Sequence, residues 1–149
     1  MINFRQSFFI LIILLGGCKT SKDVASSVDG GQSIPALIVQ DNYKPAKDNG
    51  LFNINHVTLN KNLITIDVQY SGGCAEHEFK LYTDKNYSKS QPPKLNLTLE
   101  HNPNGDMCKA IKSEQIVFDV TNAKYPGKDK KYTVILNLEG YKGDIVYKY

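Results

Sequence analysis

The chain has 149 residues, which is typical of one domain and too short for two domains of ordinary size. Hydrophobic residues make up 41% and charged residues 22% of the chain, which excludes a wholly disordered chain and a multi-span membrane protein. The formal net charge is +3, from 18 scattered Lys and Arg against 15 Asp and Glu, so we expect no nucleic-acid partner.

Residues 1–17 have the pattern of a secretory signal peptide. Arg5 makes the start positive, Phe8 to Leu15 form an apolar run, and the small residues Gly16-Gly17 follow it. As a helix the apolar run would be about 12 Å long. The hydrocarbon core of a membrane is about 30 Å thick, so this segment is predicted to be a cleaved export signal and not a transmembrane helix.

The run Leu15-Gly16-Gly17-Cys18 resembles the lipobox of bacterial lipoproteins, in which the chain is cut directly before an acylated cysteine. The resemblance implies that Cys18 carries acyl chains, and two or more such chains hold a protein stably at a membrane. Lys19 stands where an Asp would favour retention at the inner membrane, so the resemblance implies the outer membrane. We therefore expect a lipid-anchored protein of the cell envelope.

Residues 18–50 are predicted to form the acylated N-terminus and a flexible tether, because Ser, Lys, Asp, Gly and Pro dominate this stretch. One apolar run, Ala36 to Val39, interrupts the polar composition. This run either adds an edge strand to the domain or simply packs against it, and the pattern leaves both possibilities open.

Residues 51–149 have the two-residue hydrophobic period of strands with one buried face, as in Leu63 to Tyr70. The predicted strands are 51–59, 63–70, 75–83, 94–101, one marked by Ile116, Phe118 and Val120, 132–138 and 144–149. About seven one-sided strands bury their apolar faces most simply in two packed antiparallel sheets. The sequence therefore predicts an all-β, immunoglobulin-like sandwich, with a small β-barrel as the alternative.

Cys74 and Cys108 are the two cysteines that remain once Cys18 is acylated. An even number of cysteines in an oxidising compartment favours a disulfide, so we predict that these two are bonded. Closing a loop of this length would stabilise the folded domain by about 4 kcal/mol.

Two histidines lie close to these cysteines in the sequence, His77 and His101. The third and fourth predicted strands match their apolar phases when Leu81 faces Leu97. In that register His77 would lie directly opposite His101 on the inner face, at the same rim as the two cysteines.

Two imidazoles and two thiolates in one place would resemble a tetrahedral zinc site. A disulfide excludes that site, because oxidised sulfurs cannot act as thiolate ligands. With the bridge formed, a weaker zinc or copper site would use His77 and His101, with Glu76 or Asp106. Histidines that only hydrogen-bond a turn are the more common case.

The stretches Ser71 to Phe79 and Gly105 to Cys108 resemble a pattern in uncharacterised bacterial lipoproteins, and that resemblance implies a shared structural corner but no activity. The sequence contains no Gly-x-Ser-x-Gly elbow, phosphate-binding loop or His-Glu-x-x-His motif, so we expect no enzymatic activity and no cofactor. The sequence predicts a non-catalytic envelope lipoprotein whose sandwich binds an envelope protein or serves as an accessory module. The alternative is a metal-handling envelope protein that uses His77 and His101.

Overall fold

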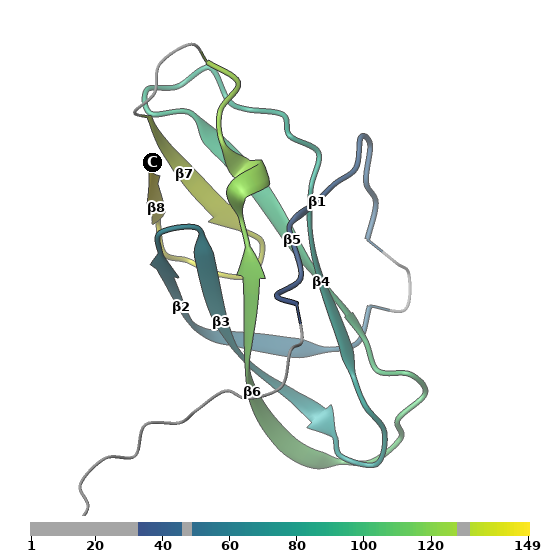
Figure 1. Ribbon diagram of the computed structural model, residues 1–149. Coiled ribbons are helices and arrows are strands. Elements are labelled where there is room, and N and C mark those ends of the chain that lie inside the picture. Colours follow the sequence, from purple (N-terminus) through teal and green to yellow (C-terminus); the bar gives the residue numbers. More distant parts are fainter. Residues whose placement is uncertain (1–32, 46–48, 128–131) are drawn as a thin grey trace, which may run out of the picture. The chain divides into compact units, whose positions relative to one another are not determined.

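A computed structural model describes residues 33–45, 49–127 and 132–149, which form one domain (Figure 1). The predicted export signal, Cys18 and the first part of the predicted tether lie outside the described residues. None of the helical segments that are described has both the length and the apolar character needed to span a lipid bilayer.

The described domain consists of strands and one short 3-10 helix, and its strands form two sheets (Figure 1). In chain order the elements are β1 (Ile38–Val39), β2 (Phe52–Asn60), β3 (Leu63–Gly72), β4 (Glu78–Thr83), β5 (Lys94–Asn102), β6 (Ala110–Asp119), η1 (Thr121–Ala123), β7 (Thr133–Leu138) and β8 (Ile145–Lys148). One sheet has the order β2-β3-β6 and the other has the order β1-β4-β5-β7-β8. The predicted two-sheet β-sandwich is therefore confirmed, and the described strands do not form a closed barrel.

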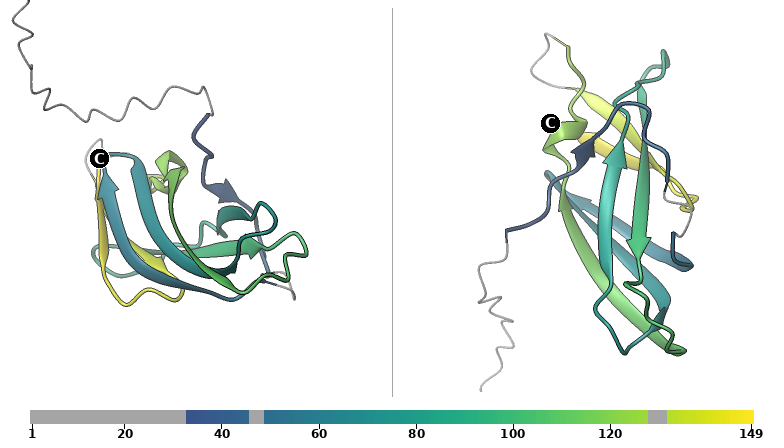
Figure 2. Two further views of the ribbon diagram at one scale, coloured as in Figure 1. Left: turned by 90° about the horizontal axis from the view of Figure 1, so that it is seen from below. Right: turned by 90° about the vertical axis from the view of Figure 1, so that its right-hand side faces the viewer.

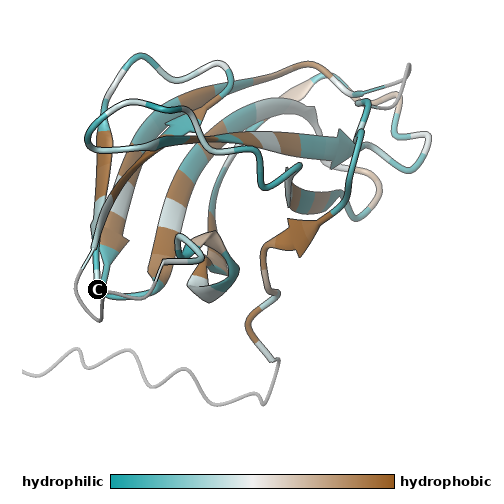
Figure 3. Ribbon diagram, turned by 90° about the horizontal axis from the view of Figure 1, so that it is seen from above, coloured by the Kyte–Doolittle hydropathy of each residue, from teal (hydrophilic) through white to brown (hydrophobic). Residues whose placement is uncertain are grey.

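The strands follow from the alternation of apolar and polar residues along the chain. In β3, Ile64, Ile66 and Val68 are at most 1% exposed, whereas the residues between them face outward. Figure 3 shows this alternation as brown and teal bands along several strands. The fully buried core between the sheets includes Leu37, Ile64, Ile66, Leu81, Leu95, Leu97, Phe118, Leu136 and Tyr147.

Two strand pairs are parallel, which the prediction of antiparallel sheets did not include. β5 pairs with β7 in parallel, and β1 pairs with β4 in parallel. The first case follows from the connection: after β5 the chain runs through β6 in the other sheet and then returns to pair with β5 in the same direction. A tight hairpin would have made this pair antiparallel.

The segment before β2, drawn in dark blue, lies beside both sheets (Figure 2), and its backbone is hydrogen-bonded to each of them. The Leu37 N–H donates to the Asp119 carbonyl at 2.8 Å, and the Asp119 N–H donates to the Pro35 carbonyl at 2.9 Å. On the other side, the Gln40 N–H donates to the Thr83 carbonyl at 2.9 Å. The side chain of Leu37 is only 1% exposed, so this segment is part of the domain core.

The predicted tether over residues 18–50 is accordingly wrong for the described residues nearest the domain. Besides the contacts of β1, Tyr43 stacks on Tyr82 with ring centroids 4.1 Å apart. The Asn49 side-chain oxygen accepts the backbone N–H of His101 at 2.6 Å. The domain thus begins before the predicted boundary at residue 51, and the apolar run at 36–39 supplies strand β1, one of the two possibilities that the sequence left open.

Candidate functional site

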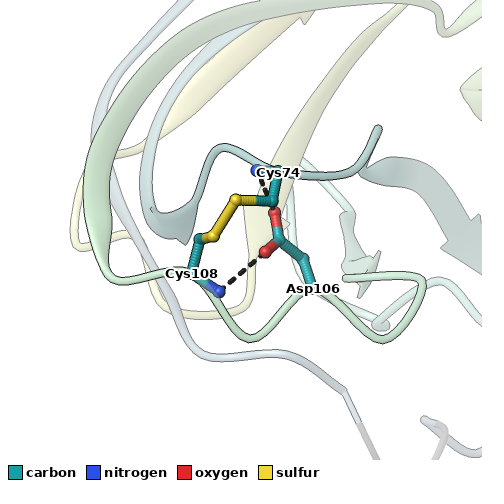
Figure 4. A group of neighbouring side chains, drawn as sticks. All are labelled: Cys74, Asp106 and Cys108. Atoms are coloured by element: carbon teal, nitrogen blue, oxygen red, sulfur yellow. Dashed lines mark hydrogen bonds between the residues drawn. A yellow bond between two sulfur atoms is a disulfide. The ribbon is translucent and has the colours of Figure 1, made fainter.

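The predicted disulfide joins Cys74, in the loop after β3, to Cys108, in the loop before β6 (Figure 4). The two Cα atoms are 5.9 Å apart. Because β3 and β6 are neighbours in one sheet and Gly72 pairs with Ala110, the bond closes the end of this strand pair. We call this end of the domain, formed by the loops 73–77 and 103–109, the disulfide corner.

The carboxylate of Asp106 organises the disulfide corner (Figure 4). Its Oδ2 atom accepts the backbone N–H groups of Gly73, Cys74 and Ala75 at 2.8, 2.8 and 2.9 Å. Its Oδ1 atom accepts the Cys108 N–H at 2.8 Å. Gly73 has a φ of +120°, which lets the three successive N–H groups converge on one oxygen. These hydrogen bonds hold the pKa of Asp106 well below its ordinary value, and the bond from the Ala75 N–H makes the largest contribution.

The two predicted histidines meet beside this carboxylate. His77 Nε2 lies 3.2 Å from Asp106 Oδ2, and His77 Nδ1 lies 2.7 Å from His101 Nε2. The chain of contacts ends at the Gly50 carbonyl, 3.1 Å from His101 Nδ1. The His77 and Asp106 side chains are 1% and 0% exposed, and His101 is 2% exposed. A Cβ at Gly50 would lie 2.7 Å from His101 Nδ1, so this close approach requires glycine.

The acceptors at the two ends of this chain of contacts fix two ring protons. The Gly50 carbonyl can only accept, so His101 donates to it from Nδ1–H. The Asp106 carboxylate also can only accept, so His77 Nε2–H donates to it. Between the rings, one proton lies on either His77 Nδ1 or His101 Nε2, and the other nitrogen accepts it. All three contacts are hydrogen bonds only when the two rings together carry three protons.

Aromatic rings enclose the histidine pair. Phe79 stacks on His101 with centroids 4.4 Å apart and an interplanar angle of 5°, and Tyr70 stacks on His77 at 4.5 Å. A Cβ at Gly72 would lie 2.5 Å from His77 Nε2, so glycine is needed here as well. Burial is the main cause that lowers the pKa of His101 from its ordinary value of 6.5, because a charged ring loses hydration in this enclosure.

The predicted register between the two strands that carry this cluster is wrong. Leu81 faces Leu99 and not Leu97, and Phe79 faces His101. The two registers differ by two residues, so the alternation of apolar residues fits both equally well. β4 begins only at Glu78, after the residues whose N–H groups bond to Asp106. The histidine at position 77 therefore reaches His101 from the loop and not from the directly opposite strand position.

The ring nitrogens and sulfurs at the disulfide corner all have partners within the protein. Each of the four ring nitrogens faces a protein atom at hydrogen-bond distance, and the two sulfurs are bonded to each other. Glu76, a further candidate ligand, is exposed, and its backbone carbonyl accepts from Asn104. In the described part of the chain, the single group of potential metal ligands is Cys74, Asp106 and Cys108, whose atoms form the disulfide and the bonds to backbone N–H groups. No observation here favours the metal-handling alternative.

An apolar hollow on the three-stranded sheet was not predicted from the sequence. Leu51 is 93% exposed and Ile111 is 68% exposed, and both line a hollow of about 360 Å³. The other lining residues are Phe52, Tyr70 and the uncharged Asn53, Gln69 and Ser71. We call this feature the apolar hollow. Its sequence signal is the position of Ile111, which is out of phase with the buried residues of β6.

Two solved structures illustrate what the fold is similar to. A NigD-like immunity protein from Bacteroides caccae has a TM-score of 0.50 and 15% identity, and the match covers 79% of this chain and 64% of that chain. A protein from Parabacteroides distasonis described as toxin-related has a TM-score of 0.48 and 18% identity, with 78% and 60% covered. At these identities the likeness concerns the fold alone, and this chain spans less than two thirds of the length of either protein.

The curated proteins include no detectable relative of this chain. A family of β-sandwich domains does match it. The family is described as the NigD-like C-terminal beta sandwich domain, and the match extends over residues 38–149. This range begins with β1 and ends with the last residue of the chain, so it includes both sheets and the disulfide corner. The chain therefore belongs to the family of NigD-like C-terminal β-sandwich domains.

Proposed function

We propose that this domain is a non-catalytic protein-binding module of the cell envelope, held at the outer membrane by acyl groups on Cys18. The observation that carries the binding role is the apolar hollow, at which Leu51 and Ile111 expose 93% and 68% of their surface. Large apolar side chains gathered around one concave site are a feature of protein interaction surfaces. Because no charged residue lines the hollow, it fits an uncharged, mainly apolar side chain of a partner protein.

The arrangement of the buried polar cluster supports a non-catalytic role. His77, His101 and Asp106 are the most chemically capable side chains of the described domain, and they bond to one another and to the backbone. A general base must reach a substrate directly or through one water molecule. These side chains are at most 2% exposed, so their geometry suits the stabilisation of the corner better than catalysis.

The first partner class to test is a protein toxin. The protein from Bacteroides caccae that shares this fold is named a NigD-like immunity protein. Some immunity proteins of other families form extremely tight complexes with their toxins. A lipid-anchored module would bring such a binding surface to the membrane at which an incoming toxin arrives.

Crosslinking in intact cells, followed by mild extraction of the membranes, tests the proposal. The wild-type chain is compared with L51D and I111D, which place a charge in the apolar hollow, and with V146D on β8. Val146 is 46% exposed and does not line the apolar hollow, so V146D is a matched control. We expect a crosslinked partner in the wild type and in V146D, and at least a tenfold loss in L51D and I111D, which corresponds to about 1.4 kcal/mol.

Two results would contradict this proposal. One is a chain that stays alone under mild extraction, and the other is a partner whose capture is unchanged by both hollow variants. The metal-handling alternative is separated by metal analysis of protein purified without a His tag. Zinc or copper bound at one equivalent, and lost on replacing His77, would favour that alternative.

A further inference from the structure

Strand β6 is a long edge strand, with β3 on one side only. It has ten residues and contains no proline. The other edge strands have features that discourage further pairing: β1 has two residues, β8 has four, and β2 has a register shift between Ile54 and His56. Among the described strands, β6 is therefore the edge best suited to pair with another strand.

The hydrogen-bonding groups on the open side of β6 can be identified from its last residue. The N–H and C=O of Asp119 bond to Pro35 and Leu37, on the side away from β3. Backbone groups alternate in direction along an antiparallel strand, so residues 111, 113, 115 and 117 point their N–H and C=O to the same side. No strand pairing of the described residues occupies this side before Asp119.

Two opposite charges flank the middle of this open edge. Lys112 and Glu114 are both exposed, and Ser113 lies between them. Lys112 forms no ion pair with any described residue, and Glu114 accepts one hydrogen bond, from the Tyr70 hydroxyl at 2.8 Å. The side chains of Lys112 and Glu114 lie on the same face of the sheet as Phe118. Side chains alternate between the two faces along a strand, and these three residues are separated by even numbers of positions.

We propose that β6 pairs in antiparallel fashion with β6 of a second copy of this chain, with Ser113 opposite Ser113. In this register each Lys112 faces Glu114 of the second copy, and opposite charges in such cross-strand positions attract each other. Ile111 faces Gln115, so the residues that point their backbone groups outward face one another. The pairing then makes about six backbone hydrogen bonds.

The charges of Lys112 and Glu114 favour this register over the two adjacent ones. Residues whose backbone groups point outward must face one another, so one strand can shift along the other only by two residues at a time. A shift in one direction would place Lys112 opposite Lys112, and a shift in the other direction would place Glu114 opposite Glu114. Both shifts place like charges directly opposite each other, which destabilises the pair. The proposal does not depend on the binding role of the apolar hollow.

A cysteine at the twofold axis tests the pairing in intact cells with the full chain. Residues in a hydrogen-bonded antiparallel pair have Cα atoms about 5.5 Å apart, which lies within the range that a disulfide bridges. S113C should therefore form a covalent dimer on a non-reducing gel. The matched control is Q69C on β3, the neighbour of Ser113 within the sheet, which the proposed pairing leaves far from its counterpart. Equal yields for both variants, or an S113C adduct with a different protein, would overturn the proposal.

Charge exchange provides the second measurement. In a K112E homodimer the new carboxylate at position 112 would face Glu114 of the second copy. In an E114K homodimer the new ammonium group at position 114 would face Lys112 of the second copy. We expect each single variant to lower the yield of the S113C dimer about tenfold. Combining K112E and E114K in one chain, or co-expressing the two single variants with different tags, restores opposite charges and should restore the dimer. A yield that the single variants leave unchanged, or that neither combination restores, would overturn the register and with it the proposal.

Discussion

The Nδ1 atom of His77 lies 2.7 Å from the Nε2 atom of His101, in the middle of a chain of contacts that runs from Asp106 to Gly50. This chain joins the loop before β4, strand β5, the β5–β6 loop and the segment before β2. The network thus fastens together segments that are distant in the sequence, and it does so inside an enclosure of Tyr70 and Phe79 rings. The titration of His101 and of Asp106 should therefore be visible in the stability of the whole domain.

The first prediction concerns His101 and pH. A base with a lower pKa in the folded than in the unfolded chain binds fewer protons when folded, so its contribution to the free energy of unfolding falls as the pH drops below 6.5. In urea titrations between pH 8 and pH 5, we expect the stability advantage of the wild type over H101Q to shrink as the pH falls.

His56 is exposed on β2, outside this network, so H56Q is the matched control for the loss of a histidine side chain. An advantage over H101Q that grows on acidification would contradict a lowered pKa of His101 in the folded chain.

The second prediction concerns Asp106. Asn at this position would replace one carboxylate oxygen by an amide that faces backbone donors, so D106N should lower the thermal midpoint clearly below that of the wild type. The folded pKa of Asp106 is lower than its ordinary value of 3.8, so its stabilisation is complete above that pH and is lost as the pH falls through the folded pKa. The difference between the wild type and D106N should therefore narrow in acid. Asp144 is exposed, and D144N should have no comparable effect.

The third prediction concerns the disulfide. Removing both cysteines, in C74A/C108A, should lower the free energy of unfolding by about 4 kcal/mol, because the unfolded chain regains the freedom of a loop with a sequence separation of 34. Chemical denaturation of the wild type with and without reductant should give a similar loss. Alkylation of the unreduced, unfolded protein followed by mass spectrometry should leave both residues unlabelled. Labelling of Cys74 and Cys108 in that experiment would rule out the bond.

The fourth prediction concerns the segment before β2. Leu37 is 1% exposed, so L37A should lower the free energy of unfolding by about 2–5 kcal/mol through the cavity it leaves. Val39 lies two positions along and is 41% exposed, so V39A should cost less than about 1 kcal/mol. Equal and small effects of the two variants would mean that this segment is a tether after all.

The fifth prediction concerns the membrane anchor. Mass spectrometry of the mature protein should find an acylated N-terminus at Cys18, and C18A should leave an uncleaved or soluble chain. An unacylated mature N-terminus, or the intact full-length chain in the cytosol, would contradict the anchor and the oxidising environment that favours the disulfide.

The sequence predicts those strands whose burial is one-sided and regular. In β3 and β7 each buried residue is followed by a more exposed one, and both strands were identified with ends close to those in the structure. β6 was predicted only from its buried second half. Its first half, 110–115, is exposed on both faces and carries Ile111 on the outer one, so no hydrophobic alternation marks it as a strand.

The candidate site was predicted in its composition but not in its arrangement. Apolar phase brought His77 and His101 together correctly, yet it gave the wrong register, because registers that differ by two residues match the apolar residues equally well. The role of Asp106 depends on three N–H groups that turn toward one point, which no pattern of residue types reveals. The apolar hollow depends on neighbours from three different strands, and such neighbours are known only once the pairing is known.

The way in which residues 35–40 are bonded also matters for mechanics. This segment bonds to Asp119 of one sheet and to Thr83 of the other, so it lies across the seam between them. If the chain is fixed to a lipid surface through its N-terminus, any load on the molecule enters the fold at this seam. Peeling the segment away would remove Leu37 from the interior, expose the last part of β6 and separate the two sheets along one side, so tension at the anchor would begin unfolding there.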